Sequence, residues 1–358
     1  MPNESTDPAA REHPEESFWQ SFASGLKKAA GATGRGLKYI YHKGDENKHY
    51  VVPAINGIVG DKLAEMNDAR AIQMSFRAGG KDIDAKASAA TIAVPGTAIV
   101  FVHGLMADEV LWQTALPEGQ GFGPLLAKEP GLHTFYVRYN TGRHISQNGQ
   151  DLSRLLDELI KAGGRRIERL VIVAHSMGGL VTRSAGYYGS KQKKKWVKKL
   201  SRVVLIGVPN DGSFLEKFGH LATVILKQIW NYPTRLVGRI ADERSNGIKD
   251  LRWGFMVDED WQQEGANDLL NVERTPVPPL PGVRYNLILG SLTESMASPL
   301  AMYFGDGLVG TRSATGQAFA TPDDPAHAFI ECRAFPTTGH IGLLASPEVF
   351  EYVREVVA

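Results

Sequence analysis

The sequence is poor in cysteine, in net charge and in long hydrophobic runs, and each shortage excludes a class of protein. Its one cysteine, Cys332, can form no disulfide within the chain and no cysteine metal cluster. No run of about eighteen apolar residues occurs, so the sequence offers no candidate membrane span. The 40 Lys and Arg residues nearly match the 39 Asp and Glu residues, and this balance gives no sign of a nucleic-acid partner.

The first residues also lack the features of a secretion signal. Residues 1–17 are acidic, contain proline, and have neither a basic stretch nor an apolar stretch. We expect them to form a disordered tail and the protein to be cytoplasmic. The rest of the chain, 43% hydrophobic over its 358 residues, is long enough to bury a full core.

The spacing of apolar residues divides the chain into regions. Residues 18–68 show helical spacing and predict an N-terminal helical extension. Short apolar runs then alternate with helical stretches, which predicts a mostly parallel, doubly wound α/β sheet built from 69–212 and 284–358. The predicted strands are Ile72–Arg77, Ala98–Val102, Thr134–Tyr139, Leu170–Ala174, Val203–Ile206, Tyr285–Leu289 and Phe329–Ala334.

Residues 213–283 form too long a connection for an ordinary crossover, and we expect them to be a helical cap or lid inserted into this core. The insertion carries apolar residues at helical spacing. Phe214, Leu226 and Trp230 among them are candidates to line a substrate pocket, although they would serve equally well as the cap's own core.

A strand, a sharp turn and a helix are predicted around Ser176. The run from Leu170 to Ala174 leads into Ser176, with Gly178 two residues beyond it. A turn sharp enough to expose a serine hydroxyl above a sheet strains the serine backbone and leaves no room for large side chains two residues away on either side. Ala174 stands where glycine is commoner, at the cost of one methyl group. The pattern is typical of a nucleophile elbow.

Further residues would complete such a site. His103-Gly-Leu-Met follows an earlier strand, so the backbone N–H groups of Leu105 and Met177 are candidates for an oxyanion hole. A base is expected beyond the serine in chain order, and His340 follows the last predicted strand. Asp306, between two glycines, is our candidate for the acid, with Glu294 as the alternative.

Four motifs in this order resemble bacterial α/β-hydrolase-fold lipases and esterases related to the glycosylphosphatidylinositol inositol-deacylase branch. They are His103-Gly-Leu-Met, Tyr139-Asn-Thr-Gly-Arg-His-Ile-Ser146, His175-Ser-Met-Gly-Gly-Leu180 and Gly305-Asp-Gly-Leu-Val309. The resemblance runs from about Pro53 to the C-terminus. It implies hydrolysis of carboxylic esters with a Ser176, Asp306 and His340 triad, and with no metal or organic cofactor.

One segment departs from that family, and another has no role that the sequence reveals. The family usually has Gly-Thr-Pro-His after the strand that ends at Ile206, whereas this chain has Gly207-Val-Pro-Asn210-Asp211, so substrate preference is open. The polar segment from Tyr139 to Ser146 is either a loop near the cap or a structural turn.

The function predicted from the sequence is therefore a serine esterase or lipase that acts on small-molecule or lipid esters, with short-to-medium acyl chains favoured. An acyltransferase or amidase with the same triad, or an inactive scaffold protein, are the alternatives. Six lysines in the Lys191–Lys199 segment surround Trp196, which would suit contact with an anionic membrane through lysines and indole, or simply a solvated face.

Overall fold

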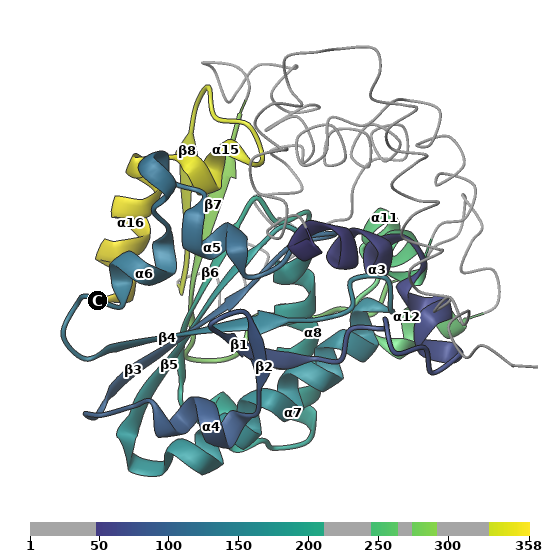
Figure 1. Cartoon of the computed structure of the whole chain (residues 1–358), viewed down its shortest axis with the longest axis horizontal. Coiled ribbons are helices and arrows are strands. Elements are labelled where there is room, and N and C mark those ends of the chain that lie inside the picture. The colour runs from purple at the N-terminus through teal and green to yellow at the C-terminus, as the bar shows by residue number, and fades with distance from the viewer. Residues whose placement is uncertain (1–47, 211–244, 264–273, 292–328) are drawn as a thin grey trace, which may run out of the picture.

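The computed structural model describes residues 48–210, 245–263, 274–291 and 329–358 (Figure 1). Their centre is an eight-stranded sheet with the strand order β2-β1-β4-β3-β5-β6-β7-β8. Strands β3 to β8 run parallel to one another, whereas β1 is antiparallel to both of its neighbours, β2 and β4. The strands are β1 (Ser75–Ala78), β2 (Lys81–Ile83), β3 (Gly96–Val102), β4 (Leu132–Arg138), β5 (Ile167–His175), β6 (Leu200–Ile206), β7 (Arg284–Gly290) and β8 (Ile330–Phe335).

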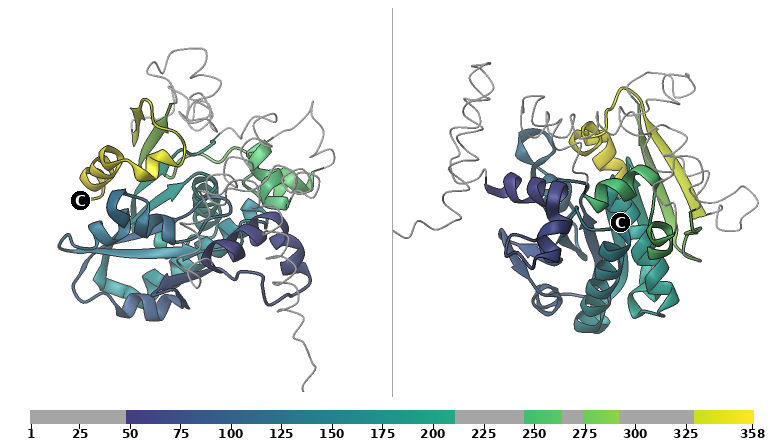
Figure 2. Two further views of the ribbon diagram at one scale, coloured as in Figure 1. Left: turned by 45° about the horizontal axis from the view of Figure 1, so that its top comes forward. Right: turned by 90° about the vertical axis from the view of Figure 1, so that its right-hand side faces the viewer.

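Helices cover both faces of this sheet, which explains why the carboxyl-terminal halves of its central strands are buried and almost entirely apolar. Successive side chains of a strand point to opposite faces. Val100 of β3 accordingly belongs to one buried cluster, and Ile99 and Phe101 belong to the other. Figures 1 and 2 show the two helical layers. The first contains α4 (Ala85–Ala90), α7 (Ile145–Gly163) and α8 (Met177–Lys191), and the second contains α5 (Val110–Thr114), α6 (Phe122–Leu126), α15 (Gly342–Ala345) and α16 (Pro347–Val357).

Three further helices lie at the carboxyl-terminal end of the sheet. Helix α3 (Lys48–Glu65) precedes the sheet, and its helical geometry is interrupted at Val59. Helices α11 (Asn246–Trp253) and α12 (Asp258–Gln262) belong to the connection between β6 and β7. Because β6 and β7 are paired neighbours in the sheet, the long connection between them is an insertion that leaves the sheet continuous. Short 3-10 turns, η1 (Pro117–Gly119), η2 (Gly164–Arg166) and η3 (Lys195–Lys198), complete the described elements.

The predicted sheet is confirmed, with two corrections at its first edge. The first strand begins at Ser75 rather than at Ile72, and it runs antiparallel to β4. Strand β2 was missed because its three residues are largely solvent-exposed and carry no apolar run. Of the predicted regions, the tail 1–17, residues 18–47 of the extension 18–68 and most of the insertion 213–283 lie outside the described residues.

The prediction that the Trp196 indole meets a membrane is wrong. Trp196 is fully buried, and its Nε1 donates a hydrogen bond to Ser153 Oγ at 3.0 Å. Trp196 therefore links η3 to α7. Lys193, Lys195 and Lys198 are exposed, so membrane contact stays a prediction that depends on lysines alone.

This sheet, with an antiparallel strand near one edge and a strand–serine–helix turn after β5, has the α/β-hydrolase fold predicted from the sequence. Parallel sheets place their ligands beyond the carboxyl ends of the strands. The turns after β3, β5 and β8 therefore lie where a ligand is expected to bind. Among the described helices, none is both long and apolar enough to span a bilayer.

Candidate active site

Ser176 occupies the turn between β5 and α8 with a strained backbone. Its φ of 52° and ψ of −127° lie in a region that residues other than glycine rarely adopt. Such a conformation costs of order 1–3 kcal/mol. The turn is held because Ser176 N–H donates to Ile206 O and Gly179 N–H donates to Ser176 O, both at 2.9 Å. A Cβ on Gly178 would contact His103 O and would lie 2.6 Å from Val102 O, which explains the small residue at this position.

The loop after β3 reaches the same turn. A Cβ on Gly104 would lie 3.0 Å from Ser176 Cβ, so the bare glycine backbone is what allows this approach. Leu105, next in the chain, is buried and lines a small pocket with Ser176. Met177 is the first residue of α8, and the N–H groups of a first helical turn have no acceptor within the helix. Both candidate oxyanion donors therefore belong to backbone beside Ser176.

His103 fixes the direction in which Leu105 N–H points. A carbonyl oxygen only accepts, so the 2.9 Å contact between His103 Nδ1 and Gly104 O requires the proton on Nδ1. The Gly104 carbonyl and the Leu105 N–H belong to one planar trans peptide and point in opposite directions. Holding this carbonyl thus aims the Leu105 N–H the other way. Tyr139 Oη supports the arrangement by donating to His103 O at 2.8 Å, and the two rings stack with centroids 4.4 Å apart.

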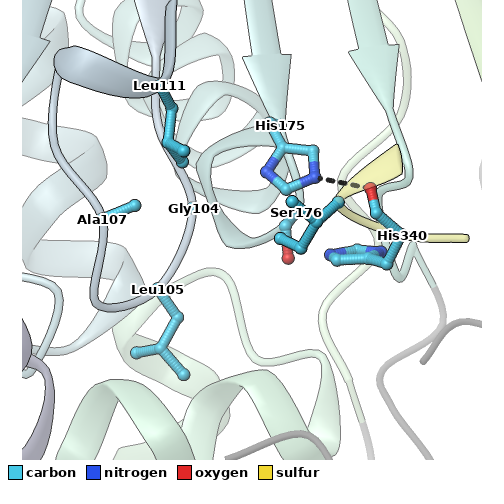
Figure 3. Close-up of a pocket in the computed structure, with 8 residues that line it drawn as sticks. Gly104, Leu105, Ala107, Leu111, His175, Ser176 and His340 are labelled. Atoms are coloured by element: carbon cyan, nitrogen blue, oxygen red, sulfur yellow. Dashed lines mark hydrogen bonds between the residues drawn. The ribbon is translucent and has the colours of Figure 1, made fainter. Parts of the chain in front are cut away.

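His340 lies beside Ser176, on the loop between β8 and α15. Figure 3 shows its ring next to the serine side chain, and both residues line the same pocket with Gly104, Leu105 and His175. His340 is buried, with only 4% of its surface exposed. His175 Nε2 donates to the His340 backbone oxygen at 3.4 Å, which ties the elbow to the histidine loop. The remaining lining of the pocket is apolar: Ala107, Leu111 and Ile341.

Burial keeps the two supporting histidines neutral. It lowers the pKa of His103 to about 4 and lowers the pKa of His175 well below its usual value, with the charge of His340 adding to the second effect. A neutral imidazole carries one proton, so each ring makes one hydrogen bond as donor. Further along the same loop, burial and the neighbouring Glu109 raise the pKa of Asp108 to about 7. Glu109 is held by an ion pair with Arg77 at 2.8 Å, and both side chains are buried.

The segment from Tyr139 to Ser146, which the sequence left without a role, joins three parts of the molecule. Thr141 Oγ1 accepts from Met106 N–H in the loop after β3. Asn140 Nδ2 donates to Gly60 O of α3 at 2.7 Å. His144 Nδ1 lies 2.9 Å from Asp250 Oδ2 of α11, and its ring stacks on Trp261 of α12. The position of this segment in the sequence could have indicated its role. The segment follows β4, and the carboxyl end of β4 lies beside the carboxyl end of β3, which the Ser176 loop contacts.

Several predicted residues cannot be placed relative to this pocket. Both candidate acids, Asp306 and Glu294, and the candidate pocket residues Phe214, Leu226 and Trp230 lie outside the described residues. Within the described ranges, no three His, Cys, Asp or Glu side chains are grouped in a way that would hold a metal ion.

Comparisons with known proteins find one family model and distantly similar solved structures. A family model described as a domain of unknown function, DUF7379, matches residues 68–242. No curated protein matches the sequence.

Among solved structures, the Bacillus licheniformis lipase BlEst2 in mature form is 18% identical, with 74% of this chain and 93% of that chain covered and a TM-score of 0.47. Phospholipase PlaB from Legionella pneumophila is 16% identical, with 74% and 60% covered and a TM-score of 0.47. The bottromycin epimerase BotH, in complex with bottromycin A2, is 14% identical, with 74% and 92% covered and a TM-score of 0.39. At these identities and TM-scores, none of the three likenesses assigns a reaction to this chain.

Proposed function

We propose that this chain is a serine hydrolase that cleaves carboxylic esters through an acyl-enzyme intermediate. The observation that carries the proposal is the strained Ser176 turn, with His340 beside it in one buried pocket. A serine held at positive φ between a strand and a helix is costly, and such strain persists where exposing the hydroxyl is useful. A metal-independent acyl transfer needs only a nucleophile, a base and donors for the oxyanion, and the residues around this pocket offer all three.

In this mechanism His340 removes the proton from Ser176 Oγ as the oxygen attacks the ester carbonyl. The N–H groups of Leu105 and Met177 donate to the oxygen that becomes negatively charged. His340 then gives the proton to the leaving alcohol, and afterwards activates the water that releases the acid. Asp306 would orient His340 and stabilise its charged form, a role for which Glu294 is the alternative.

The substrate is proposed to be a small-molecule or lipid ester with a short-to-medium acyl chain. The apolar pocket lining, Leu105, Ala107, Leu111 and Ile341, suits an acyl group rather than a charged one. Phe214, Leu226 and Trp230 of the insertion would extend this surface. The relation to the inositol-deacylase branch stays a prediction from the motifs.

The test is hydrolysis of p-nitrophenyl esters from acetate to dodecanoate by the purified protein. Ser176→Ala should lower turnover by about a million-fold, as removal of a serine nucleophile does in a comparable triad. Ser88→Ala is the matched control, because Ser88 is also fully buried but belongs to α4. Equal activity of wild type and Ser176→Ala would refute the proposal. Diversion of the acyl group to added alcohol or amine would instead identify an acyltransferase.

A further inference from the structure

The residue after the candidate oxyanion donor has a strained backbone of its own. Met106 has a φ of 57°, in the left-handed region, and it is buried. A residue other than glycine in this region costs of order 1–3 kcal/mol unless its surroundings hold it there. The conformation of Met106 sets the direction of the chain leaving Leu105, so the interactions that hold Met106 also hold the donor.

The main interaction is with Thr141. Met106 N–H donates to Thr141 Oγ1 at 3.2 Å, and Thr141 is 1% exposed. Helix α3 closes the other side of this contact. A Cβ on Gly57 would overlap Met106 Cγ and would lie 3.2 Å from Thr141 Oγ1, so the helix backbone packs directly on both residues. Met106 is thus enclosed between two segments that are far apart in sequence.

Leu105 is therefore fixed through the peptide on each side of it. The peptide before it is held where His103 Nδ1 donates to Gly104 O. The peptide after it is held where Thr141 Oγ1 accepts from Met106 N–H. Because each peptide is planar, fixing both leaves the Leu105 backbone little freedom, and its N–H keeps one direction. Donors aimed in advance at a developing charge need no reorganisation during the reaction.

We propose that Thr141 is a positioning residue that holds Met106 in the left-handed conformation and thereby aims the Leu105 N–H at the oxyanion. This inference rests on the proposed function. It gives the segment from Tyr139 to Ser146 a catalytic purpose, because that segment then preorganises the pocket without contacting substrate. Helix α3 acts together with Thr141, because its backbone at Gly57 packs on both Met106 and Thr141.

The test compares Thr141→Val, which replaces the oxygen by a methyl group, with Thr141→Ser, which keeps it. Loss of one oxyanion donor costs about 100- to 1,000-fold in kcat, and a displaced donor should cost less, about 10- to 100-fold. Thr141→Val should therefore lower kcat by about 10- to 100-fold with KM unchanged, and should weaken binding of a boronic acid, a mimic of the tetrahedral intermediate, by a similar factor. Thr141→Ser should restore most of the activity.

Two controls separate positioning from stability. Thr97→Val makes the same change at a buried threonine near the opposite end of β3, and it should leave kcat unchanged. Hydrogen–deuterium exchange of the peptide covering residues 103–110 should be faster in Thr141→Val than in wild type, whatever the activity. If Thr141→Val does not fold, Thr141→Ala removes the same oxygen with less bulk.

Wild-type kcat and wild-type exchange in the folded Thr141 variant would overturn the inference while leaving the ester hydrolase intact. A wild-type protein that cleaves no ester would refute the proposed function, and the exchange result would still decide whether Thr141 holds the loop. A variant with fast exchange but normal kcat and normal boronic acid binding would show a structural contact without a catalytic role, and would also overturn the inference.

Discussion

Gly178 and Gly186 lie on the same helix, α8, and their replacement by alanine should have opposite effects. A Cβ on Gly178 would lie 2.6 Å from Val102 O and closer still to His103 O, and backbone oxygens cannot move aside as side chains do. A Cβ on Gly186 would meet only the flexible Leu280 side chain, at 3.3 Å or more. Alanine favours a helix over glycine by about 0.8–1.0 kcal/mol at interior positions. This gain applies to Gly186, whereas Gly178 is the second residue of α8 and lies in its first turn.

The clash at the elbow is therefore expected to dominate the difference between the two variants, and the helix gain at Gly186 adds to it in the same direction. Overpacking of this kind costs about 1–3 kcal/mol. At about 1–2 °C per kcal/mol for a chain of this length, the clash alone should make Gly178→Ala melt roughly 1–6 °C below Gly186→Ala. Helix α8 must also withdraw from the loop after β3, and a displacement near 1 Å costs about 100-fold in rate. We expect kcat to fall by that order in Gly178→Ala only.

Thermal melting and p-nitrophenyl acetate hydrolysis measure both effects on the same preparations. Gly186→Ala should melt at or above the wild-type temperature with wild-type kcat. Equal melting temperatures and equal kcat for the two variants would refute the close approach of α8 to the loop.

Three further predictions concern other parts of the site. Asp306→Asn should lower kcat by about four orders of magnitude through the wrong histidine tautomer, and Glu294→Gln should do little; the reverse ranking would move the acid to Glu294. Asp108 binds its proton up to about pH 7 when folded but only to about 3.8 when unfolded, so it opposes folding increasingly as pH rises from about 4 to 7. Asp108→Asn, which keeps an acceptor for Val110 N–H, should therefore raise the melting temperature more at pH 8 than at pH 4; an equal change at both pH values would contradict the raised pKa. Leu226→Ala should reduce octanoate hydrolysis more than acetate hydrolysis, since each contacting methylene contributes about 0.8 kcal/mol; an equal loss on both esters would place the acyl pocket elsewhere.

The central strands and the elbow were predictable because local sequence determines them. A strand segment buried on both faces must be apolar, as Leu170–Ala174 of β5 is, and a glycine two residues after Ser176 indicates the space that the turn requires. The exposed strand β2 carries no such signal. Its three residues form a strand because β1 pairs with them, which is a tertiary cause.

The supporting residues were harder to predict because they act across distant parts of the chain. Thr141 lies 35 residues from Met106 in sequence, and Asp250 lies 106 residues from His144. Neither pair shows a periodicity or a motif that joins its members. The burial of Trp196 was missed for a related reason. Its lysine neighbours in sequence indicate an exposed segment, whereas its indole donates to Ser153, which is distant in sequence.

The most direct test of the central claim is covalent trapping of the nucleophile. Wild-type protein is treated with a fluorophosphonate, and the modified residue is identified by peptide mass spectrometry. We predict one adduct on Ser176, formed rapidly in wild type, absent in Ser176→Ala and strongly slowed in His340→Gln. No adduct in wild type, or an adduct that persists in Ser176→Ala, would contradict the assignment of Ser176 as the nucleophile.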